Sequence, residues 1–509
     1  MTIFLGDGDE IFIGMGANRD TVNGGAGTDF IDLGAGNDTA EAEGNEAEFD
    51  TLIGGAGNDQ IVNISAGPLV LNNFNDGVQV SGFERIVLND QELLGNDGDN
   101  VFNFAGIRLD GATAVRTLGG DDTVTVTERR IETYDLGDDD DTAQVFGNAA
   151  DRDILIGGAG TDEIVNIGES TFSLSGFNDG ARVTGFERID GNGYALEGDD
   201  RNNVFDFTGV AVDDVDRIFA EGGNDTVIGT ERRNEAYDLG DGDDSFSGSG
   251  NRKDTVNGGD GVDTIDTGGG NDTIEVARSE AEFDTIHGGS GKDQIVNVGS
   301  GSFRLANFND GTQVSSIERI AGDGGDLLGT SDATTFDFSG VRVDGIDEIR
   351  TLGGDDVVIG TERRNLNYDL GSGDDTFTAT GGSKNTVFGD IGEDTIIGGA
   401  GRDSLNGGGD DDLLTGNGDQ DTFTFDGPFF GNDTITDFES GIDRANFSGS
   451  GLSFADFDAN NDGVLNAGDA SGGRVDIVDG SLVLTVDSGN ASVTFEDVTE
   501  LSDQDIAFA

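Results

Sequence analysis

A nine-residue unit, G-G-x-G-x-D-x-U-x with U a large apolar residue, recurs along the chain and limits what it can fold into. Clear copies occupy residues 54–62 and 288–296, and four more follow in tandem over 389–424. The glycines supply tight turns with positive φ, and the strand triplet around U is too short to be stable outside a stack. Two units make one coil, and successive coils stack about 4.7–4.9 Å apart with U inward. We expect an all-β fold, a right-handed parallel β-roll or β-helix solenoid with a β-rich C-terminal cap.

A larger repeat is superimposed on the nonapeptides. A segment that ends in E-R-I begins at residues 58, 161 and 292, which are 103 and 131 residues apart, and a second block follows at the same spacings from residues 101, 204 and 335. The shorter spacing lacks 28 residues, about three nonapeptides. The predicted parts are copy one (1–100), copy two (101–203), the start of copy three with extra nonapeptides (204–334), its end with the terminal nonapeptide run (335–424), and the cap (425–509).

The acidic charge needs compensation. The chain has 103 Asp and Glu against 27 Lys and Arg, a formal net charge of −76. At an effective dielectric constant of about 20, two carboxylates roughly 5 Å apart repel by about 3 kcal/mol, so stacked acids require cations. Nucleic acid and anionic lipid are excluded as partners because they attract Lys and Arg. The absence of Cys excludes disulfides, and no apolar run approaches the roughly 18 residues of a membrane span.

The aspartate at position six of the unit points to Ca²⁺. One carboxylate with a few turn carbonyls supplies about half of the six to eight oxygens that Ca²⁺ takes, so a neighbouring turn must supply the rest. Metal binding and folding are then one equilibrium.

With these motifs the chain resembles the RTX, or hemolysin-type calcium-binding repeat, family. The resemblance implies a β-roll with Ca²⁺ in its turns, unfolded in the calcium-poor cytoplasm and folded outside the cell. The implied carboxylate ligands are Asp20, Asp29, Asp38, Asp59, Asp162, Asp244, Asp263, Asp272, Asp293, Asp375, Asp394, Asp403, Asp412 and Asp421. The first glycines assigned to these sites are Gly24, Gly54, Gly157, Gly258, Gly288 and Gly398. Similar turns at Asp122, Asp225 and Asp356 are further candidates, whereas Glu10 in place of Asp and Asp410 in place of Gly depart from the motif.

A second kind of calcium site is predicted at residues 458–469, D-A-N-N-D-G-V-L-N-A-G-D. Gly463 stands where an EF-hand loop makes its sharp turn. The residues at loop positions 1, 3, 5, 7, 9 and 12 are Asp458, Asn460, Asp462, Val464 (through its carbonyl), Asn466 and Asp469. An Asp at position 12 reaches less far than the usual Glu, a variant that resembles dockerin-type loops.

The region from Phe425 onward resembles the C-terminal module of RTX exoproteins such as the serralysins, through D-x-I-x-D-F-x-x-G-x-D at residues 433–443. The resemblance implies an uncleaved signal for the type I secretion apparatus, which ends in acidic and then apolar residues, here Asp503, Asp505, Ile506 and Phe508. The first ten residues lack the features of a cleavable signal peptide. We therefore expect a protein that is extracellular or at the cell surface.

Scarce positive charge is concentrated in triplicated pairs: Glu84 and Arg85, Glu187 and Arg188, Glu318 and Arg319, and Arg129 and Arg130, Arg232 and Arg233, Arg363 and Arg364. Two interpretations stay open at this point. The arginines form salt bridges to neighbouring aspartates, or they make a stripe for subunit contacts.

The sequence favours a scaffold over an enzyme. A catalytic site normally occurs once, whereas these blocks are triplicated, and the single histidine, His287, excludes a zinc-histidine cluster. We interpret His287 as a solenoid residue. The leading hypothesis is a structural surface or matrix component, comparable with RTX S-layer or filament proteins, which self-assembles or binds cell-surface polysaccharide. Alternatives are a calcium-dependent adhesin or carbohydrate-binding protein and, less favoured, a polysaccharide-acting exoenzyme or toxin.

Overall fold

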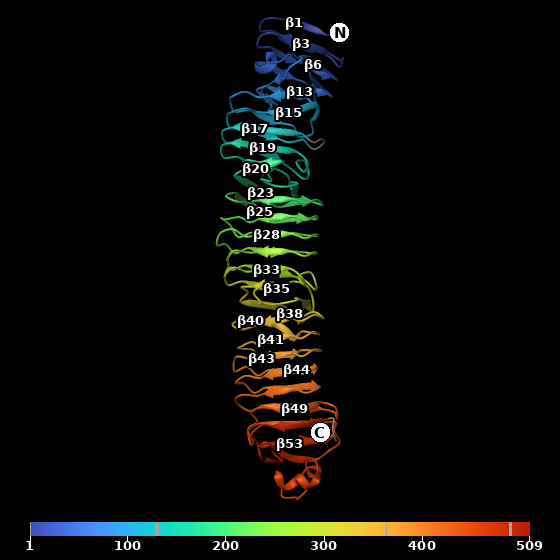
Figure 1. Cartoon of the computed structure of the whole chain (residues 1–509). Coiled ribbons are helices and arrows are strands. Elements are labelled where there is room, and N and C mark those ends of the chain that lie inside the picture. The colour runs from blue at the N-terminus through green and yellow to red at the C-terminus, as the bar shows by residue number, and fades with distance from the viewer. Residues whose placement is uncertain (1, 128–131, 363, 488–490, 509) are drawn as a thin grey trace. The chain divides into compact units, whose positions relative to one another are not determined.

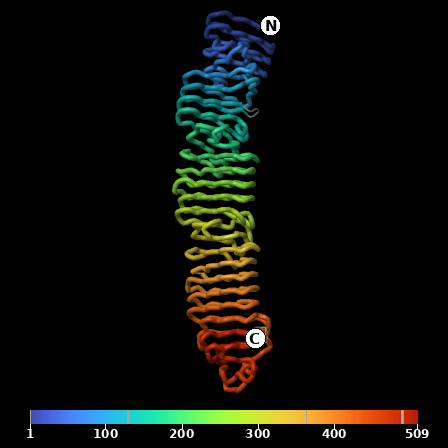
Figure 2. Tube along the Cα trace, viewed as in Figure 1, coloured from blue at the N-terminus to red at the C-terminus, as the bar shows by residue number. Residues whose placement is uncertain are grey.

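The computed structural model describes residues 2–127, 132–362, 364–487 and 491–508, and their regular secondary structure is almost entirely β-strand, joined by turns (Figure 1). The chain divides into two units, Met1–Val256 and Asn257–Ala509. In each unit the trace winds through successive coils (Figure 2), and the solenoid strands pair in parallel with strands of the neighbouring coil. The prediction of an all-β parallel solenoid is confirmed.

In unit 1 each coil contributes one strand to each of two walls. The strands of the first wall are β1 (Ile3–Gly6), β3 (Thr21–Gly25), β6 (Thr39–Ala42), β9 (Gln60–Asn63), β10 (Leu69–Val70), β13 (Arg85–Leu94), β15 (Arg108–Arg116), β17 (Thr133–Asp138), β19 (Ile154–Ala159) and β22 (Val183–Thr184), followed by β24 (Val204–Asp206), β26 (Thr226–Ile228) and β28 (Ser245–Ser247). The strands of the second wall are β2 (Ile11–Ile13), β4 (Phe30–Asp32), β7 (Thr51–Ile53) and β12 (Val80–Ser81), followed by β11 (Asn73–Phe74), β14 (Val101–Asn103), β16 (Thr123–Thr125), β18 (Thr142–Val145), β20 (Glu163–Asn166), β21 (Phe172–Ser173), β23 (Arg188–Asp199), β25 (Ala211–Glu221) and β27 (Ala236–Asp238). The turn strands β5 (Ala35–Gly36) and β8 (Ala56–Gly57) pair with each other, and η1 (Glu46–Phe49) is a short 3-10 helix.

Unit 2 repeats this plan. One wall contains β32 (Thr273–Val276), β35 (Gln294–Asn297), β36 (Phe303–Arg304), β38 (Arg319–Leu328), β40 (Arg342–Arg350), β42 (Asn367–Asp369), β44 (Thr386–Ile391), β46 (Ser404–Gly409), β48 (Thr422–Asp426), β50 (Arg444–Ser448) and β56 (Ile506–Phe508). The other contains β30 (Thr264–Asp266), β33 (Thr285–His287) and β37 (Val314–Ser315), followed by β39 (Thr335–Asp337), β41 (Val357–Ile359), β43 (Thr376–Thr378), β45 (Thr395–Ile397), β47 (Leu413–Thr415) and β49 (Gly431–Ile435). The turn strands β31 (Gly269–Gly270) and β34 (Ser290–Gly291) pair with each other, and β29 (Thr255–Asn257) lies at the division between the units.

The C-terminal cap is rich in β-strands, as predicted, and several of these strands pair antiparallel. β52 (Val475–Val478), β53 (Ser481–Asp487) and β54 (Ala491–Phe495) form an antiparallel meander that joins β49 through β54. β51 (Val464–Leu465) pairs with β55 (Leu501–Ser502), and η2 (Phe454–Asp456) and η3 (Ala467–Gly472) are 3-10 helices. Among the described residues, no helix has both the length and the apolar character needed to span a membrane.

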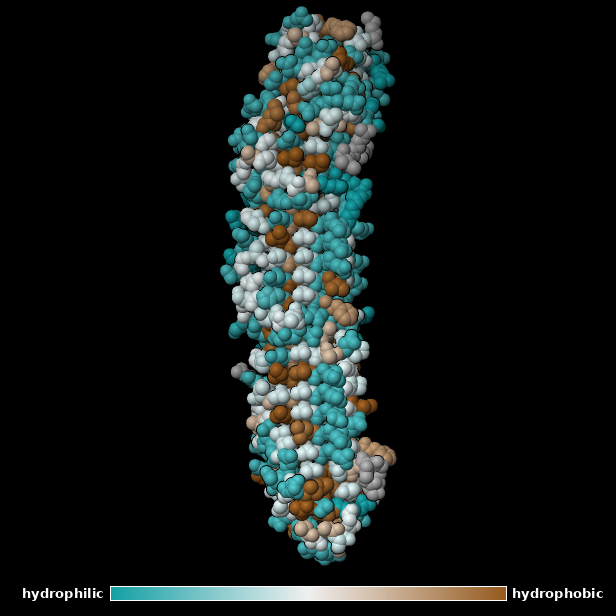
Figure 3. All heavy atoms as spheres, viewed as in Figure 1, coloured by the Kyte–Doolittle hydropathy of each residue, from teal (hydrophilic) through white to brown (hydrophobic). Residues whose placement is uncertain are grey.

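The core is a column of inward side chains. In a three-residue strand such as β4 the middle residue is buried and its neighbours are not, so Ile31 is buried while Phe30 and Asp32 are partly exposed. Each coil adds one such residue per wall, which stacks on the next and excludes water without needing a long strand. On the face shown in Figure 3, hydrophilic side chains form bands along the stacked coils.

The first two large repeats in unit 1 present their long strands on opposite walls. β13 and β15, from the segment that begins at residue 58 and the block that begins at residue 101, belong to the first wall, whereas their equivalents β23 and β25, from residues 161 and 204, belong to the second. The 103 residues between the copies therefore contain an odd number of half-coils.

Candidate metal sites in the turns

Each predicted turn aspartate is the residue just before a strand. Asp29 precedes β4, Asp59 precedes β9, and Asp394 precedes β45. The glycine turn reverses the chain from one wall to the other, so the aspartates of successive coils stack in columns along the two edges of each unit. We call such a column an aspartate ladder.

Within a ladder the backbone N–H of each aspartate donates to Oδ1 of the aspartate one coil further on. Asp375 donates to Asp394 at 2.8 Å, and Asp394 donates to Asp412 at 2.9 Å. The same contact joins these pairs, donor first: Asp20 and Asp38, Asp38 and Asp59, Asp29 and Asp50, Asp122 and Asp141, Asp141 and Asp162, Asp225 and Asp244, Asp263 and Asp284, Asp272 and Asp293, Asp356 and Asp375, Asp412 and Asp433, Asp403 and Asp421, and Asp421 and Asp443. The structure therefore brings every predicted turn aspartate into a ladder.

The second oxygen of many ladder aspartates has no hydrogen-bond partner. Oδ2 is buried and unpartnered within the described part of the chain in Asp29, Asp38, Asp59, Asp122, Asp141, Asp153, Asp162, Asp225, Asp293, Asp356, Asp375, Asp394, Asp403, Asp412, Asp421 and Asp433. A buried polar atom left without a partner costs about 1–3 kcal/mol, and more when it is charged. Each of these ladder positions would therefore be stabilised by a positive group close to Oδ2.

Burial raises the pKa of these carboxyls. Desolvation is the largest cause, and repulsion from neighbouring carboxylates adds to it, so that the pKa of Asp375, Asp394 and Asp412 rises to about 7 in each case. In Asp433, the same two causes raise the pKa to about 9, and in Asp141 to about 8. At neutral pH and without a cation, the ladders resist full ionisation.

The first glycine of each turn makes room for the carboxylate. A Cβ at Gly389 would lie 2.1 Å from Oδ2 of Asp394, and one at Gly407 would lie 2.0 Å from Oδ2 of Asp412. At the predicted positions Gly24, Gly157, Gly258 and Gly398 the corresponding distances to Oδ2 are 2.3, 2.7, 2.3 and 2.7 Å. At Gly54 and Gly288 a Cβ would first meet a backbone carbonyl oxygen, at 2.1 and 2.2 Å.

Later glycines of the turn lie against backbone oxygens of the preceding coil. A Cβ at Gly57 would lie 1.4 Å from the carbonyl oxygen of Gly36, and one at Gly291 would lie 1.5 Å from that of Gly270. Both glycines have positive φ, 154° and 149°. Only glycine allows successive turns to approach this closely, and the approach brings hard carbonyl oxygens next to the ladder carboxylates.

The three glutamates of the triplicated Glu-Arg pairs end ladders. The N–H of Asp59 donates to Oε2 of Glu84 at 2.7 Å, and Glu187 and Glu318 accept in the same way from Asp162 and Asp293, at 2.9 and 2.8 Å. The adjacent arginines form the expected salt bridges, Arg85 to Asp110, Arg188 to Asp213 and Arg319 to Asp344. Arg129, Arg130 and Arg363 lie outside the described residues.

Sequence reasoning missed the ladder members whose turns lack the glycine pattern. They are Asp50, Asp141, Asp153, Asp254, Asp284, Asp433 and Asp443, and each lies just before a strand except Asp433, which lies within β49. A usable signal exists for four of them, because Asp50, Asp153, Asp254 and Asp284 begin D-x-U-x followed by G-G. At the two departures from the motif, Glu10 turns its side chain back to accept from Gly8 N–H at 3.3 Å, and Asp410 adopts the glycine-like φ of 81°.

The predicted loop at 458–469 closes on itself through its own side chains. Oδ2 of Asp458 accepts from Gly463 N–H at 2.9 Å, and Oδ1 of Asn460 accepts from Asp462 N–H at 2.8 Å. The buried carboxylate of Asp469 accepts from the N–H groups of Asn460 and Asn466, at 3.0 and 3.1 Å, and the N–H of Val464 donates to Asp462 at 3.0 Å. The carboxylates at both ends of the loop are thereby tied into it.

Among the described residues, no three His, Asp or Glu side chains converge as a site built only from side chains would require. The ladders instead offer single carboxylates spaced by coils, with backbone carbonyl oxygens next to them. This donor set consists of hard oxygens and suits Ca²⁺ better than a transition metal.

Comparison with known families assigns these turns. The family model for the RTX calcium-binding nonapeptide repeat (4 copies) matches residues 4–40, 46–62, 149–165, 211–231, 238–274, 275–297 and 388–423. The chain carries RTX calcium-binding repeats. RTX repeats are calcium-binding motifs, and the matched segments contain every carboxylate ligand that the resemblance implies except Asp375. Of the three further candidates they contain Asp225 but not Asp122 or Asp356. No curated protein matches the chain.

Proposed function

We propose that this RTX protein is secreted, folds when Ca²⁺ binds to it outside the cell, and serves as a structural component of the cell surface or matrix, in the manner of an S-layer or filament. The observation that carries the proposal is the row of buried, unpartnered Oδ2 atoms in both units. The unpartnered carboxylate oxygens are spread over many coils and are not gathered in one site. This distribution supports a scaffold in which many coils depend on calcium.

The residues fit the ion. Each site would use the Oδ2 of a ladder aspartate, for example Asp394 or Asp412, with carbonyl oxygens from its own turn and from the adjacent turn. Bound Ca²⁺ supplies the positive charge that lets the carboxyls ionise inside the fold. The loop at 458–469 would hold one further ion through Asp458, Asn460, Asp462, the Val464 carbonyl, Asn466 and Asp469.

The C-terminal residues support export before folding. Ile506 is buried in β56, which pairs with β50, and the Phe508 ring lies 5.4 Å from that of Phe447. Oδ1 of Asp505 accepts from Gly441 N–H at 2.6 Å. A segment packed in this way is not accessible to a secretion apparatus, so a type I signal here would have to be recognised in the unfolded, calcium-free chain.

A non-enzymatic role agrees with the repeated architecture. The ladders and the long strands recur in each copy, and His287 lies exposed on β33 with its Nδ1 2.7 Å from Oγ of Ser315. This position matches the interpretation of His287 as a solenoid residue.

Electron microscopy of the purified full chain, with and without millimolar Ca²⁺, tests the structural role. We expect filaments or sheets that form only with Ca²⁺ and at high protein concentration. Circular dichroism of the same samples reports folding separately. Folded protein that stays monomeric at high concentration would overturn the structural role while leaving calcium-dependent folding intact.

A further inference from the structure

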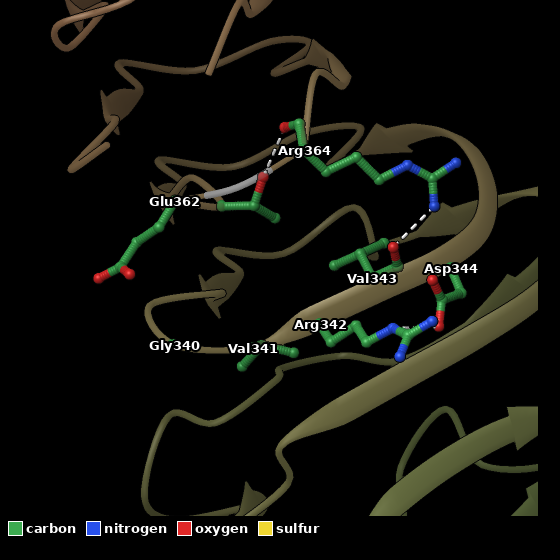
Figure 4. A pocket seen from close by; sticks show the side chains of 8 residues that line it. Gly340, Val341, Arg342, Val343, Asp344, Glu362 and Arg364 are labelled. Atoms are coloured by element: carbon green, nitrogen blue, oxygen red, sulfur yellow. Dashed lines mark hydrogen bonds and ion pairs between the residues drawn. The ribbon is translucent and has the colours of Figure 1, made fainter. Parts of the chain in front are cut away.

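A cavity of about 430 Å³ lies beside the long strand β40, away from the aspartate ladders (Figure 4). Its wall consists of the beginning of β40, the residues just before it, and residues 361, 362 and 364. The lining residues are Gly340, Val341, Arg342, Val343, Asp344, Thr361, Glu362 and Arg364. Two guanidinium groups and two carboxylates thus share one concave surface with Val341, and we call this surface the arginine notch.

The loop that carries Arg364 is anchored in the core. The hydroxyl of Tyr368, a fully buried side chain, accepts from Thr361 N–H at 3.0 Å, and Thr361 Oγ1 donates to the carbonyl of Arg364 at 2.8 Å. Nη1 of Arg364 donates to the Val343 carbonyl at 2.7 Å. These contacts fix the guanidinium at the cavity before any ligand arrives.

Two arginines and two carboxylates line the cavity, and Arg319 adds a third guanidinium beside Asp344. Nε of Arg319 and Nε of Arg342 each lie 2.8 Å from Oδ2 of Asp344. These two arginines hold the pKa of the Asp344 carboxyl below its usual range. Figure 4 shows the guanidinium groups of Arg342 and Arg364 near Asp344, whereas the carboxylate of Glu362 points away. Most of the Arg342 side chain, 72%, is exposed, so donors remain for a ligand.

Part of this arrangement recurs in unit 1. In the block that begins at residue 204, Tyr237 accepts from Thr230 N–H at 3.0 Å, and Arg233 forms an ion pair of 2.8 Å with Asp213. In the block that begins at residue 101, Tyr134 accepts from Thr127 N–H at 3.1 Å. Arg85 and Arg108 both donate to Asp110 there, while residues 128–131 are not described.

These two aspartates lie on opposite walls of unit 1. Asp110 belongs to β15 in the first wall and Asp213 to β25 in the second. The block that begins at residue 204 also has Ala211 where the blocks from residues 101 and 335 have Arg108 and Arg342. Its sequence therefore has one arginine fewer at this place.

We propose that this arginine notch, and its counterpart in the block that begins at residue 204, bind the carboxylates of uronic acid residues in an acidic polysaccharide. The planar guanidinium fork suits a carboxylate, the partly exposed Val341 offers an apolar surface to the C–H face of a sugar ring, and the cavity has the size of a small-ligand site. Recurrence of the arginine and aspartate pair favours a polymer over a single small anion, because linked sites gain from multivalency. This inference requires the calcium-folded chain but not the self-assembly proposed above.

Isothermal titration of the full chain in Ca²⁺ with a hexamer of galacturonic acid, and with its carboxyl-reduced neutral counterpart, tests the proposal. We expect the acidic hexamer alone to bind, and R342Q/R364Q to weaken the copy-three site at least tenfold without changing the circular dichroism spectrum. R402Q is the matched control, because Arg402 is an exposed arginine on a nonapeptide turn, bonded to Gln420.

Two results would overturn the proposal. Equal binding by wild type and R342Q/R364Q would show that Ca²⁺ merely bridges the hexamer to acidic turns. Arginine-dependent self-association in analytical ultracentrifugation, with no hexamer binding, would assign the notches to a second copy of the chain.

Discussion

The backbone N–H of Asp394 donates to Oδ1 of Asp412 at 2.9 Å, and Oδ2 of both residues is buried without a hydrogen-bond partner among the described residues. Oδ1 of the carboxylate therefore links neighbouring coils by a hydrogen bond, while Oδ2 is left for a cation to bind. Hydrogen bonding fixes the ladder, but it does not neutralise it.

Without calcium, the fold should become more stable as the pH falls from about 8 to about 5. The pKa of Asp375, Asp394 and Asp412 is about 7 in the fold against 3.8 as the ordinary value, so the folded state holds protons that the unfolded chain has released. The resulting stability is fully present below pH 3.8 and is lost as the pH rises through about 7. Thermal unfolding in EDTA at several pH values measures this, and a midpoint that is constant or falls on acidification contradicts it.

Replacing one ladder carboxylate by its neutral isostere should have opposite effects with and without calcium. In D394N the side-chain oxygen can still accept from Asp375 N–H, but the buried charge is gone. We expect D394N to shift the calcium-free folding equilibrium toward the fold by about 1–2 kcal/mol at pH 8, so that the pH below which the chain folds in EDTA rises, and to raise the calcium concentration needed for folding at pH 7.5. Circular dichroism measures both midpoints. D419N, at an exposed aspartate in the following turn, is the control and should change neither. Destabilisation of the calcium-free chain by D394N would argue against a repulsive ladder.

The sequence predicted the ladders only where glycine marks the turn. Asp394 and Asp412 follow the motif, whereas Asp153 and Asp284 reach the same columns from loops without its glycines, because coil stacking positions any residue that precedes a strand. The role of Glu318 depends on the pairing of β35 with β38, which brings it next to Asp293, 25 residues away in sequence. Local pattern does not encode such register. The exchange of walls between copies one and two likewise depends on how many half-coils the irregular loops contain.

The first glycine of a turn should tolerate no side chain. In G407A the new Cβ would meet Oδ2 of Asp412 at 2.0 Å, so the carboxylate must leave its position. We expect a loss of about 1–3 kcal/mol in calcium and a higher calcium requirement, measured by denaturant unfolding at fixed Ca²⁺. G382A is the control, since a Cβ there meets nothing within 4 Å. Equal behaviour of the two variants would contradict the assigned turn geometry.

Removing a ladder-ending glutamate should expose its function as an acceptor. E318A leaves the N–H of Asp293 without its acceptor, at a cost of about 1–2 kcal/mol, whereas E318Q retains an oxygen that can accept. Chemical denaturation of both variants in Ca²⁺ should rank wild type and E318Q above E318A. If E318Q is as unstable as E318A, the charge of Glu318 matters more than its hydrogen bond.

The central claim is that calcium makes this acidic array foldable at neutral pH. Far-UV circular dichroism of the purified full chain at pH 7.5, titrated from EDTA into millimolar Ca²⁺, tests it most directly. The account predicts a disordered spectrum in EDTA that converts cooperatively to a β-strand spectrum as Ca²⁺ is added. A β-strand spectrum that EDTA leaves unchanged would contradict it.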